Sequence, residues 1–60
     1  MNLISINQLS EKLSIKVKTI YDWTHKGEIP YIKVGRLLRF DSAEIDKWLN
    51  GRKHPRPGRN

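Results

Sequence analysis

The chain has 60 residues, no cysteine and a net charge of +6, from twelve lysine and arginine side chains against six acidic ones. A chain of this length forms one small domain with little room for a deep substrate cavity, and without cysteine it has neither disulfides nor thiolate zinc sites. No apolar run approaches the ~20 residues of a membrane span, and the N-terminus lacks the pattern of a signal peptide, so we expect a cytoplasmic protein without membrane contact, metal or cofactor.

The first predicted element is a helix over residues 6–13. Ser5 and Gln8 have the spacing of a capping box, in which each side chain accepts a hydrogen bond from the backbone of the other residue. Nothing on this helix suggests chemistry, so we expect it to serve as scaffold. Its apolar stripe at helical spacing consists of Ile6, Leu9 and Leu13.

The stretch KTIYDWTHKGEIP, residues 18–30, supplies most of a second predicted helix, over residues 17–26. Gly27 suits the left-handed residue that closes a helix, and Pro30 cannot continue one. The apolar face comprises Val17, Ile20, Tyr21, Trp23 and Thr24. The opposite side presents Lys18, Thr19, Asp22, His25 and Lys26. We therefore expect an amphipathic helix whose polar side contacts a partner.

A β-hairpin around Gly35 is predicted from YIKVGRLLRF, in which apolar residues alternate with cations on both sides of the glycine. A two-residue loop would pair Ile32 with Arg39 and would place an arginine on the apolar face. We favour a three-residue loop, residues 35–37, because every apolar pair then shares one face. In that register the pairs are Val34 with Leu38, Ile32 with Phe40, and Lys33 with Arg39 on the other face, with Arg36 and Leu37 exposed at the tip.

A third helix is predicted over residues 42–50, with Gly51 as its stop. Asp41 and Glu44 have capping-box spacing, which explains both carboxylates better than a catalytic acid/base pair does. Its apolar face consists of Ile45, Trp48 and Leu49. The remaining GRKHPRPGRN has no apolar anchor besides proline. We therefore divide the chain into a folded domain, residues 1–50, and a flexible basic tail, residues 51–60.

The positive charge is concentrated in two segments. Residues 16–39 carry six cations against Asp22 and Glu28, for a net +4, and the last ten residues carry four cations and no acid, also +4. Residues 1–15 are neutral and residues 41–50 sum to −2. Such clustering indicates a polyanionic partner, either nucleic acid or an anionic membrane. Membrane binding is the weaker alternative, because no helix combines a large exposed apolar face with a basic one.

The order of elements is helix, helix, hairpin, helix, which predicts a mainly α fold with a small β-hairpin, a winged helix-turn-helix. Two helices joined by a tight turn commonly place the second helix in the major groove of DNA, which is about 12 Å wide. The hairpin beside it would contact phosphates or the neighbouring minor groove. Double-stranded DNA is therefore the expected partner of the polar side of the second helix.

The run LSEKLSIKVKTIYDWTHKGEIPYIKVGRLLRFDSAEIDKWL resembles the excisionase-type DNA-binding domains, a MerR-like winged helix-turn-helix family. The resemblance covers residues 5–49. It is carried by Leu9 to Leu13, Thr19-Ile20-Tyr21-x-Trp23, Gly27-x-Ile29-Pro30, Val34-Gly35-Arg36, Arg39-Phe40 and Ile45-x-x-Trp48-Leu49. It implies sequence-specific binding by the second helix, with the hairpin as the wing. Members serve as recombination directionality factors (excisionases) of prophages and integrative elements, or as small transcriptional regulators.

Three positions depart from the usual pattern of that family. Lys16 stands where a Ser or Thr usually starts the second helix, so either Ser14 caps an earlier start or the cap is weak. Val17 replaces a polar residue, and Asp22 replaces a common arginine. We therefore transfer no target sequence from the family.

The expected contacts to DNA fall into three groups. Those of the second helix are Lys16, Lys18, Thr19, Tyr21, Asp22, His25 and Lys26. Those of the wing are Lys33, Arg36 and Arg39, and those of the tail are Arg52, Lys53, Arg56 and Arg59. Lys18 and Thr19 are expected near base edges and Arg36 on the DNA beneath the wing. Asp22 either accepts from a cytosine amino group or pairs locally with Lys18 or Lys26. Trp23 and Trp48 are expected in the core.

The leading functional hypothesis is a non-enzymatic excisionase that acts beside an integrase or another recombinase. A transcriptional regulator of a mobile element would use the same chemistry. A third hypothesis, from another class, is a protein-interaction adaptor that binds an acidic partner through its basic tail. One domain this small contacts about one half-site, so we expect a monomer in solution that assembles cooperatively on DNA.

Overall fold

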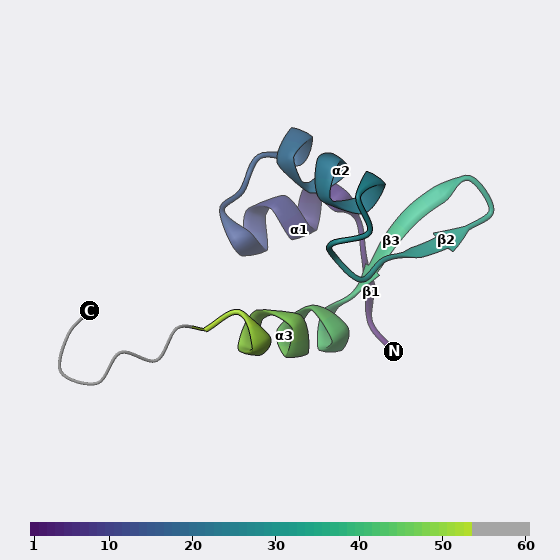
Figure 1. Cartoon of the computed structure of the whole chain (residues 1–60). Helices are drawn as coiled ribbons and strands as arrows, with labels where there is room; N and C mark the ends of the chain where they lie inside the picture. The colour runs from purple at the N-terminus through teal and green to yellow at the C-terminus, as the bar shows by residue number, and fades with distance from the viewer. Residues whose placement is uncertain (54–60) are drawn as a thin grey trace, which may run out of the picture.

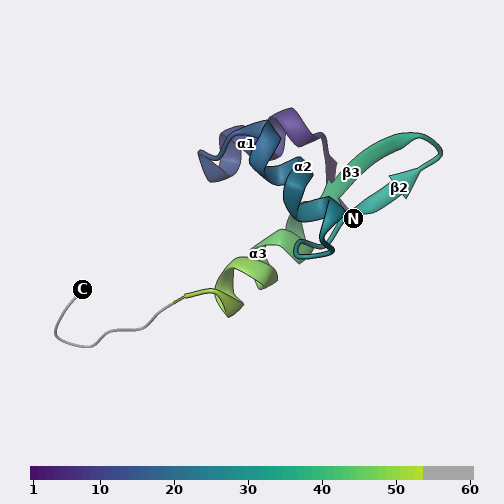
Figure 2. The ribbon, with the colours of Figure 1, turned by 45° about the horizontal axis from the view of Figure 1, so that its top comes forward.

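The computed structural model describes residues 1–53 and contains three helices and a three-stranded antiparallel sheet (Figure 1). The two N-terminal helices lie together on one side, α3 lies on the other, and the hairpin projects outward (Figures 1 and 2). This confirms the mainly helical winged fold. No helix in residues 1–53 has the length and apolarity to cross a membrane. In chain order the elements are β1 (Leu3–Ile4), α1 (Ile6–Leu13), α2 (Val17–His25), β2 (Ile32–Val34), β3 (Leu37–Asp41) and α3 (Ser42–Gly51).

Helix α1 has the predicted bounds and the predicted capping box. The Gln8 backbone N–H donates to the Ser5 hydroxyl at 3.1 Å, and the Ser5 N–H donates to the Gln8 side-chain oxygen at 2.8 Å. Two backbone donors that a helix start leaves unpaired are thus satisfied. Leu9 is fully buried, while Ile6 and Leu13 pack at the edge of the core. The helix therefore acts as scaffold, as its stripe predicts.

The turn between the first two helices depends on a left-handed serine. Ser14 has φ +58°, and its N–H donates to the Glu11 carbonyl, while Ile15 donates to the Ser10 carbonyl at 3.1 Å. A residue other than glycine in this region carries a steric cost from its Cβ atom. Ser14 thus ends α1, and the alternative in which it caps an early start of α2 is wrong. The N-cap of α2 is Lys16, whose side chain accepts no hydrogen bond.

A glycine turn ends α2 and redirects the chain into the core. Gly27 has φ +68°; its N–H donates to the Thr24 carbonyl at 3.1 Å, and the Glu28 N–H donates to the Trp23 carbonyl at 2.8 Å. These two bonds constitute a Schellman motif. The helix ends at His25, one residue before the predicted end. Immediately after the turn, Ile29 is 3% exposed and belongs to the core.

The register of the hairpin differs from the prediction. Val34 pairs with Leu37, Lys33 with Leu38, and Ile32 with Arg39, so the loop has two residues, Gly35 and Arg36. Gly35 has φ +64° and Arg36 does not, as in a type II′ turn, which favours glycine at its first central position. The apolar-face argument was wrong because the end of the hairpin extends beyond the core, and Val34 and Leu37 are exposed there. Turn chemistry decides the register instead.

A third strand completes the sheet. Strand β1 pairs antiparallel with β3, so that the strand order is β1-β3-β2. Its register joins Leu3 to Asp41 and Ile4 to Phe40. The sequence analysis did not predict this strand. We call β2, β3 and their turn the wing; β3 runs from the turn at the wing tip through the sheet to the start of α3 (Figure 1).

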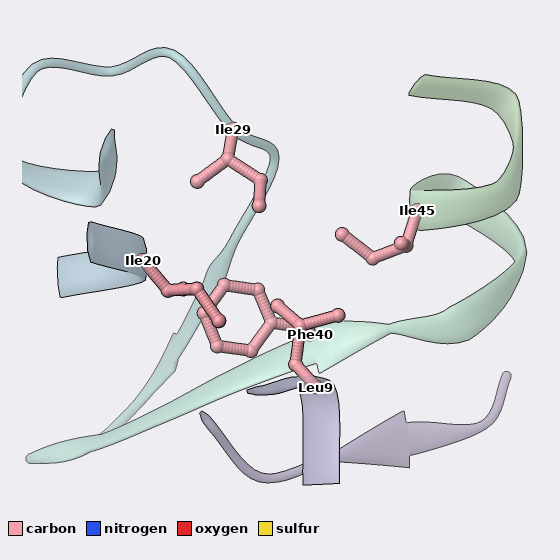
Figure 3. Close-up of a cluster of buried hydrophobic side chains, with 5 residues drawn as sticks. All are labelled: Leu9, Ile20, Ile29, Phe40 and Ile45. Carbon is pink, nitrogen blue, oxygen red and sulfur yellow. The ribbon is translucent and has the colours of Figure 1, made fainter. Parts of the chain in front are cut away.

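Five side chains form the buried core, and they come from all three helices, β3 and the loop before β2 (Figure 3). Phe40 is fully buried and is the largest of them, with the four aliphatic side chains arranged around its ring (Figure 3). The core thereby fixes the position of α2 relative to β3. The members are Leu9, Ile20, Ile29, Phe40 and Ile45.

Helix α3 is capped by Asp41, which accepts from the Ala43 N–H at 3.3 Å rather than from Glu44, so the predicted capping box does not form. The helix extends through Gly51, one residue beyond the predicted domain limit. The Trp48 indole N–H donates to the Glu28 carbonyl at 2.9 Å. Further contacts join Trp48 to Trp23, with ring centroids 5.6 Å apart, and Lys12 to Asp46, at 3.5 Å.

Candidate nucleic-acid interface

A concave surface of about 380 Å³ lies between α2 and the wing; we call it the cleft. Tyr21, Thr24 and His25 line it from α2, and Lys33, Arg36 and Arg39 line it from the wing. The structure thus brings together five side chains that the sequence analysis assigned to two separate contact groups. The remaining lining residues are Ile6, Tyr31, Leu37 and Leu38. The cleft is strongly cationic on its wing side and carries no acidic side chain.

The outer face of α2 presents the predicted polar residues to solvent. Lys18 and His25 are exposed, Thr19 is half-buried, and Tyr21 is 50% exposed at the edge of the apolar face. Lys16 is exposed at the N-cap. Neither Lys16 nor Lys18 has an ion-pair partner among residues 1–53. Their ammonium groups are therefore available for phosphate or base contacts at the start of the helix.

Asp22 and Lys26 form an ion pair one helical turn apart, with 3.1 Å between carboxylate and ammonium. The hydrogen bond from Lys26 and the negative charge of Asp22 raise the pKa of Lys26 above 10.5, and the charge of Glu28 adds to this. Of the two alternatives for Asp22, the structure shows the local pair. The net charge of this part of the helix is reduced, so Lys16 and Lys18 carry the positive field of α2.

The Asp22→Asn variant is expected to lower the pKa of Lys26 toward its ordinary value, because the hydrogen bond is weakened to one with a neutral amide oxygen and the negative charge is removed. NMR titration of the lysine side chain measures this. Because the folded-state pKa is raised, the stabilisation is complete below 10.5 and is lost as the pH rises through the folded-state value; stability near neutral pH does not vary from this source. Glu28→Gln is the control and should lower the pKa less. An equal effect of the two variants would contradict the assignment to Asp22.

The predicted register would place Lys33 and Arg39 on the same face of the hairpin, but the structure does not. Lys33 pairs across the strands with Leu38, and Arg39 with Ile32, which places the two cations on opposite faces of the hairpin. Both still line the cleft. The Arg39 guanidinium donates to the Leu38 carbonyl at 2.8 Å, and Arg39 is only half-exposed. Arg36 is exposed in the turn.

The first cation of the predicted tail, Arg52, packs on the folded domain. The Arg52 guanidinium carbon lies 4.5 Å from the centre of the Trp48 ring, and the group also donates to the Glu28 carbonyl at 3.4 Å. Lys53 is exposed. The predicted contacts of Arg56 and Arg59, and most of the predicted flexible tail, lie outside the described residues.

Sequence reasoning missed two features of the cleft. Tyr31 is 44% exposed and lines it, although it precedes β2 and carries no charge. Leu37 lines it as well, as a partner of Val34. The only sequence signal for Tyr31 is an aromatic residue next to a basic strand. Within residues 1–53, no three His, Asp or Glu side chains converge into a metal-binding group.

Two helices joined by a tight turn, with the second helix beside a basic hairpin, define a winged helix-turn-helix domain. The sequence leads to the same class, since the model of a family described as Helix-turn-helix domain matches residues 3–53. The chain belongs to this family, which is a family of DNA-binding domains. No curated protein and no solved structure matches the chain.

Proposed function

We propose that this protein binds double-stranded DNA with sequence preference, with α2 in the major groove and the wing on the adjacent backbone and minor groove. The observation that carries the proposal is the cleft. Adjacent major and minor grooves are separated by one sugar–phosphate strand. A protein that engages both grooves must therefore accommodate that strand between its two contact elements, and the cleft has the cations for it.

Each group of side chains then has a distinct task. Lys18 and Thr19, near the N-terminus of α2, reach base edges, as the leading residues of recognition helices do. Lys16 neutralises a phosphate beside them. In the cleft, Arg36 and Lys33 contact the backbone, and the hydroxyl of Tyr21 donates to a phosphate from the rim of the helix. Base contacts specify the site, and phosphate contacts set the orientation.

Salt dependence tests this proposal. Four to six neutralised phosphates predict that log K falls with log salt with a slope near −4 to −5. Fluorescence anisotropy of a labelled duplex at several salt concentrations measures the slope. Thr19→Ala should change which sequences are selected from a random pool, whereas Arg36→Ala should weaken binding to all sequences alike. Absence of duplex binding would contradict the proposal and would leave the adaptor hypothesis, in which the tail binds an acidic partner.

The biological role that we propose is that of an excisionase of a prophage or integrative element, acting with an integrase. Its support is the resemblance of residues 5–49 to excisionase-type domains. A small transcriptional regulator of such an element would present the same surface. An integrase gene beside this one would favour the excisionase, and an excision assay with that integrase discriminates the two roles. Stimulation of excision supports the excisionase; repression of a neighbouring promoter without such stimulation supports the regulator.

The proposed assembly is a monomer that gathers cooperatively on DNA. One α2 and one wing cover about one half-site, so useful specificity needs several bound copies or a partner. Sedimentation of the free protein should give one chain, and footprints on the DNA flanking its own gene should show repeated protected sites. A stable dimer in the absence of DNA would contradict this assembly.

A further inference from the structure

Two apolar side chains are exposed together at the wing tip. Val34 and Leu37 flank the turn on its two sides, are 48% and 54% exposed, and pair directly across the strands. We call them the tip pair. The core reaches only as far as Leu38 and Phe40 along β3. A cross-strand pair of threonines would also support the hairpin, so the fold does not require apolar side chains here.

The tip is narrow and surrounded by positive charge. Its two turn residues are Gly35, which has no side chain, and Arg36. Lys33 adjoins Val34, and residues 31–40 contain three cations and no acid. The centres of protein–protein interfaces are depleted of charged residues, whereas DNA attracts them. A slender cationic ribbon end also suits the minor groove, which is about 6 Å wide. The charge and shape around the tip pair therefore favour DNA as its occupant.

We infer, on the basis of the proposed function, that the tip pair is an apolar wedge for the minor groove. In this arrangement the positive charge of Arg36 attracts the wing tip to the groove. Val34 and Leu37 then contact the deoxyribose walls and one base step. Apolar side chains at such positions partly unstack the step and bend the duplex. The wing thereby contributes more than phosphate contacts.

The wedge has a consequence for sequence preference. Pyrimidine–purine steps unstack and kink more readily than others, so the protein favours such a step beneath the wing. No hydrogen bond to a base edge is needed for this preference. It adds a second source of specificity, independent of Lys18 and Thr19 on α2.

The test uses the Val34→Thr/Leu37→Thr variant, which keeps the net charge and the strand propensity. Its matched control is Leu3→Thr, because Leu3 is also an exposed strand residue, 40% exposed, on β1 at the other edge of the sheet. The duplex is the one that wild-type protein selects from a random pool. The variant should bind it about tenfold more weakly, with an unchanged slope of log K against log salt, because no phosphate contact is lost. The control should bind as wild type does.

Local unstacking gives an independent readout. With 2-aminopurine placed at successive steps of the selected duplex, wild-type protein and the Leu3→Thr control should raise its fluorescence at one step. The double variant at saturating concentration should not. The pool selected by the double variant should also lose the pyrimidine–purine preference at that step while it keeps the preference that α2 determines. Circular dichroism establishes that both variants are folded.

The possible results separate the wedge from the proposed function. If wild-type protein binds duplexes but the double variant matches it in affinity, selected sequence and fluorescence, the wedge is overturned and the proposed function stands. A reduced salt slope for the double variant also overturns the wedge, since the tip would then act through phosphates. Self-association of the wild type that the double variant abolishes, with DNA binding intact, would make the tip pair a protein interface. Absence of any duplex binding overturns both proposals.

Discussion

Replacement of Phe40 by alanine is expected to unfold most of the protein at 25 °C. The ring is fully buried in the core, among side chains from all three helices and from the loop before β2 (Figure 3). Deletion of a buried phenylalanine side chain costs about 3–5 kcal/mol. A chain of this size has a free energy of unfolding of roughly 3–9 kcal/mol. The loss is therefore comparable with the whole stability, and the far-ultraviolet circular dichroism at 222 nm should fall accordingly.

The control for this prediction is Leu37→Ala, three residues earlier on the same strand. Leu37 is 54% exposed, so its truncation should change the free energy of unfolding by less than about 0.5 kcal/mol. Urea titrations of both variants give the comparison. Similar midpoints for the two variants would show that the core is not organised around Phe40.

Removal of two wing cations is expected to give the largest loss of DNA affinity. In the Lys33→Ala/Arg36→Ala variant, two phosphate contacts disappear, and each lowers the salt slope by about 0.9. Each phosphate contact makes the binding constant about tenfold larger at 0.1 M monovalent salt than at 1 M. Loss of two contacts should therefore lower the affinity at 0.1 M salt about 100-fold. Both side chains are exposed and line the cleft, and stability should change little. Anisotropy titrations across a salt series measure affinity and slope together.

A charge-matched variant isolates the position of these cations from their number. Lys12→Ala/Lys47→Ala also removes two positive charges, but from α1 and α3, outside the cleft. Lys12 faces Asp46 on α3 rather than the proposed DNA surface. For the Lys12→Ala/Lys47→Ala variant, the slope of log K against log salt should stay close to that of the wild type. If the two double variants weaken binding equally, then net charge alone attracts DNA, and the cleft has no special role.

The helices were predictable because their signals are local. The capping box of Ser5 and Gln8 and the glycine stop at Gly27 act within one helical turn, and the structure has both. The apolar periodicity likewise identified Leu9, Ile20 and Ile45 as buried. For the candidate site, the same periodicity separates the polar side of α2 from its buried side. Whether those polar residues contact DNA stays a prediction.

The predictions failed where the structure depends on a partner distant in the sequence, or where a residue is exposed and burial imposes no pattern on it. Strand β1 has two residues, and its partner β3 lies more than thirty residues away along the chain, so no local pattern announces it. Ile29 is buried by the turn that precedes it rather than by any period of its own. The hairpin register followed the type II′ turn at Gly35, because burial imposes no face on the exposed tip. The left-handed conformation at Ser14 was not predicted, because the usual sequence signal for that conformation is a glycine and this position is a serine.

The path of β3 has a mechanical consequence. This strand passes from the exposed tip, through the fully buried Phe40, to the Asp41 cap of α3 without an intervening loop. If the wing distorts a duplex as proposed, the resulting twist on the hairpin would be transmitted to the hydrophobic core and to the first turn of α3, because no loop lies between them to act as a hinge. Backbone amides around Ala43 should change in hydrogen-exchange rate when DNA occupies the wing tip, although no residue of α3 lines the cleft.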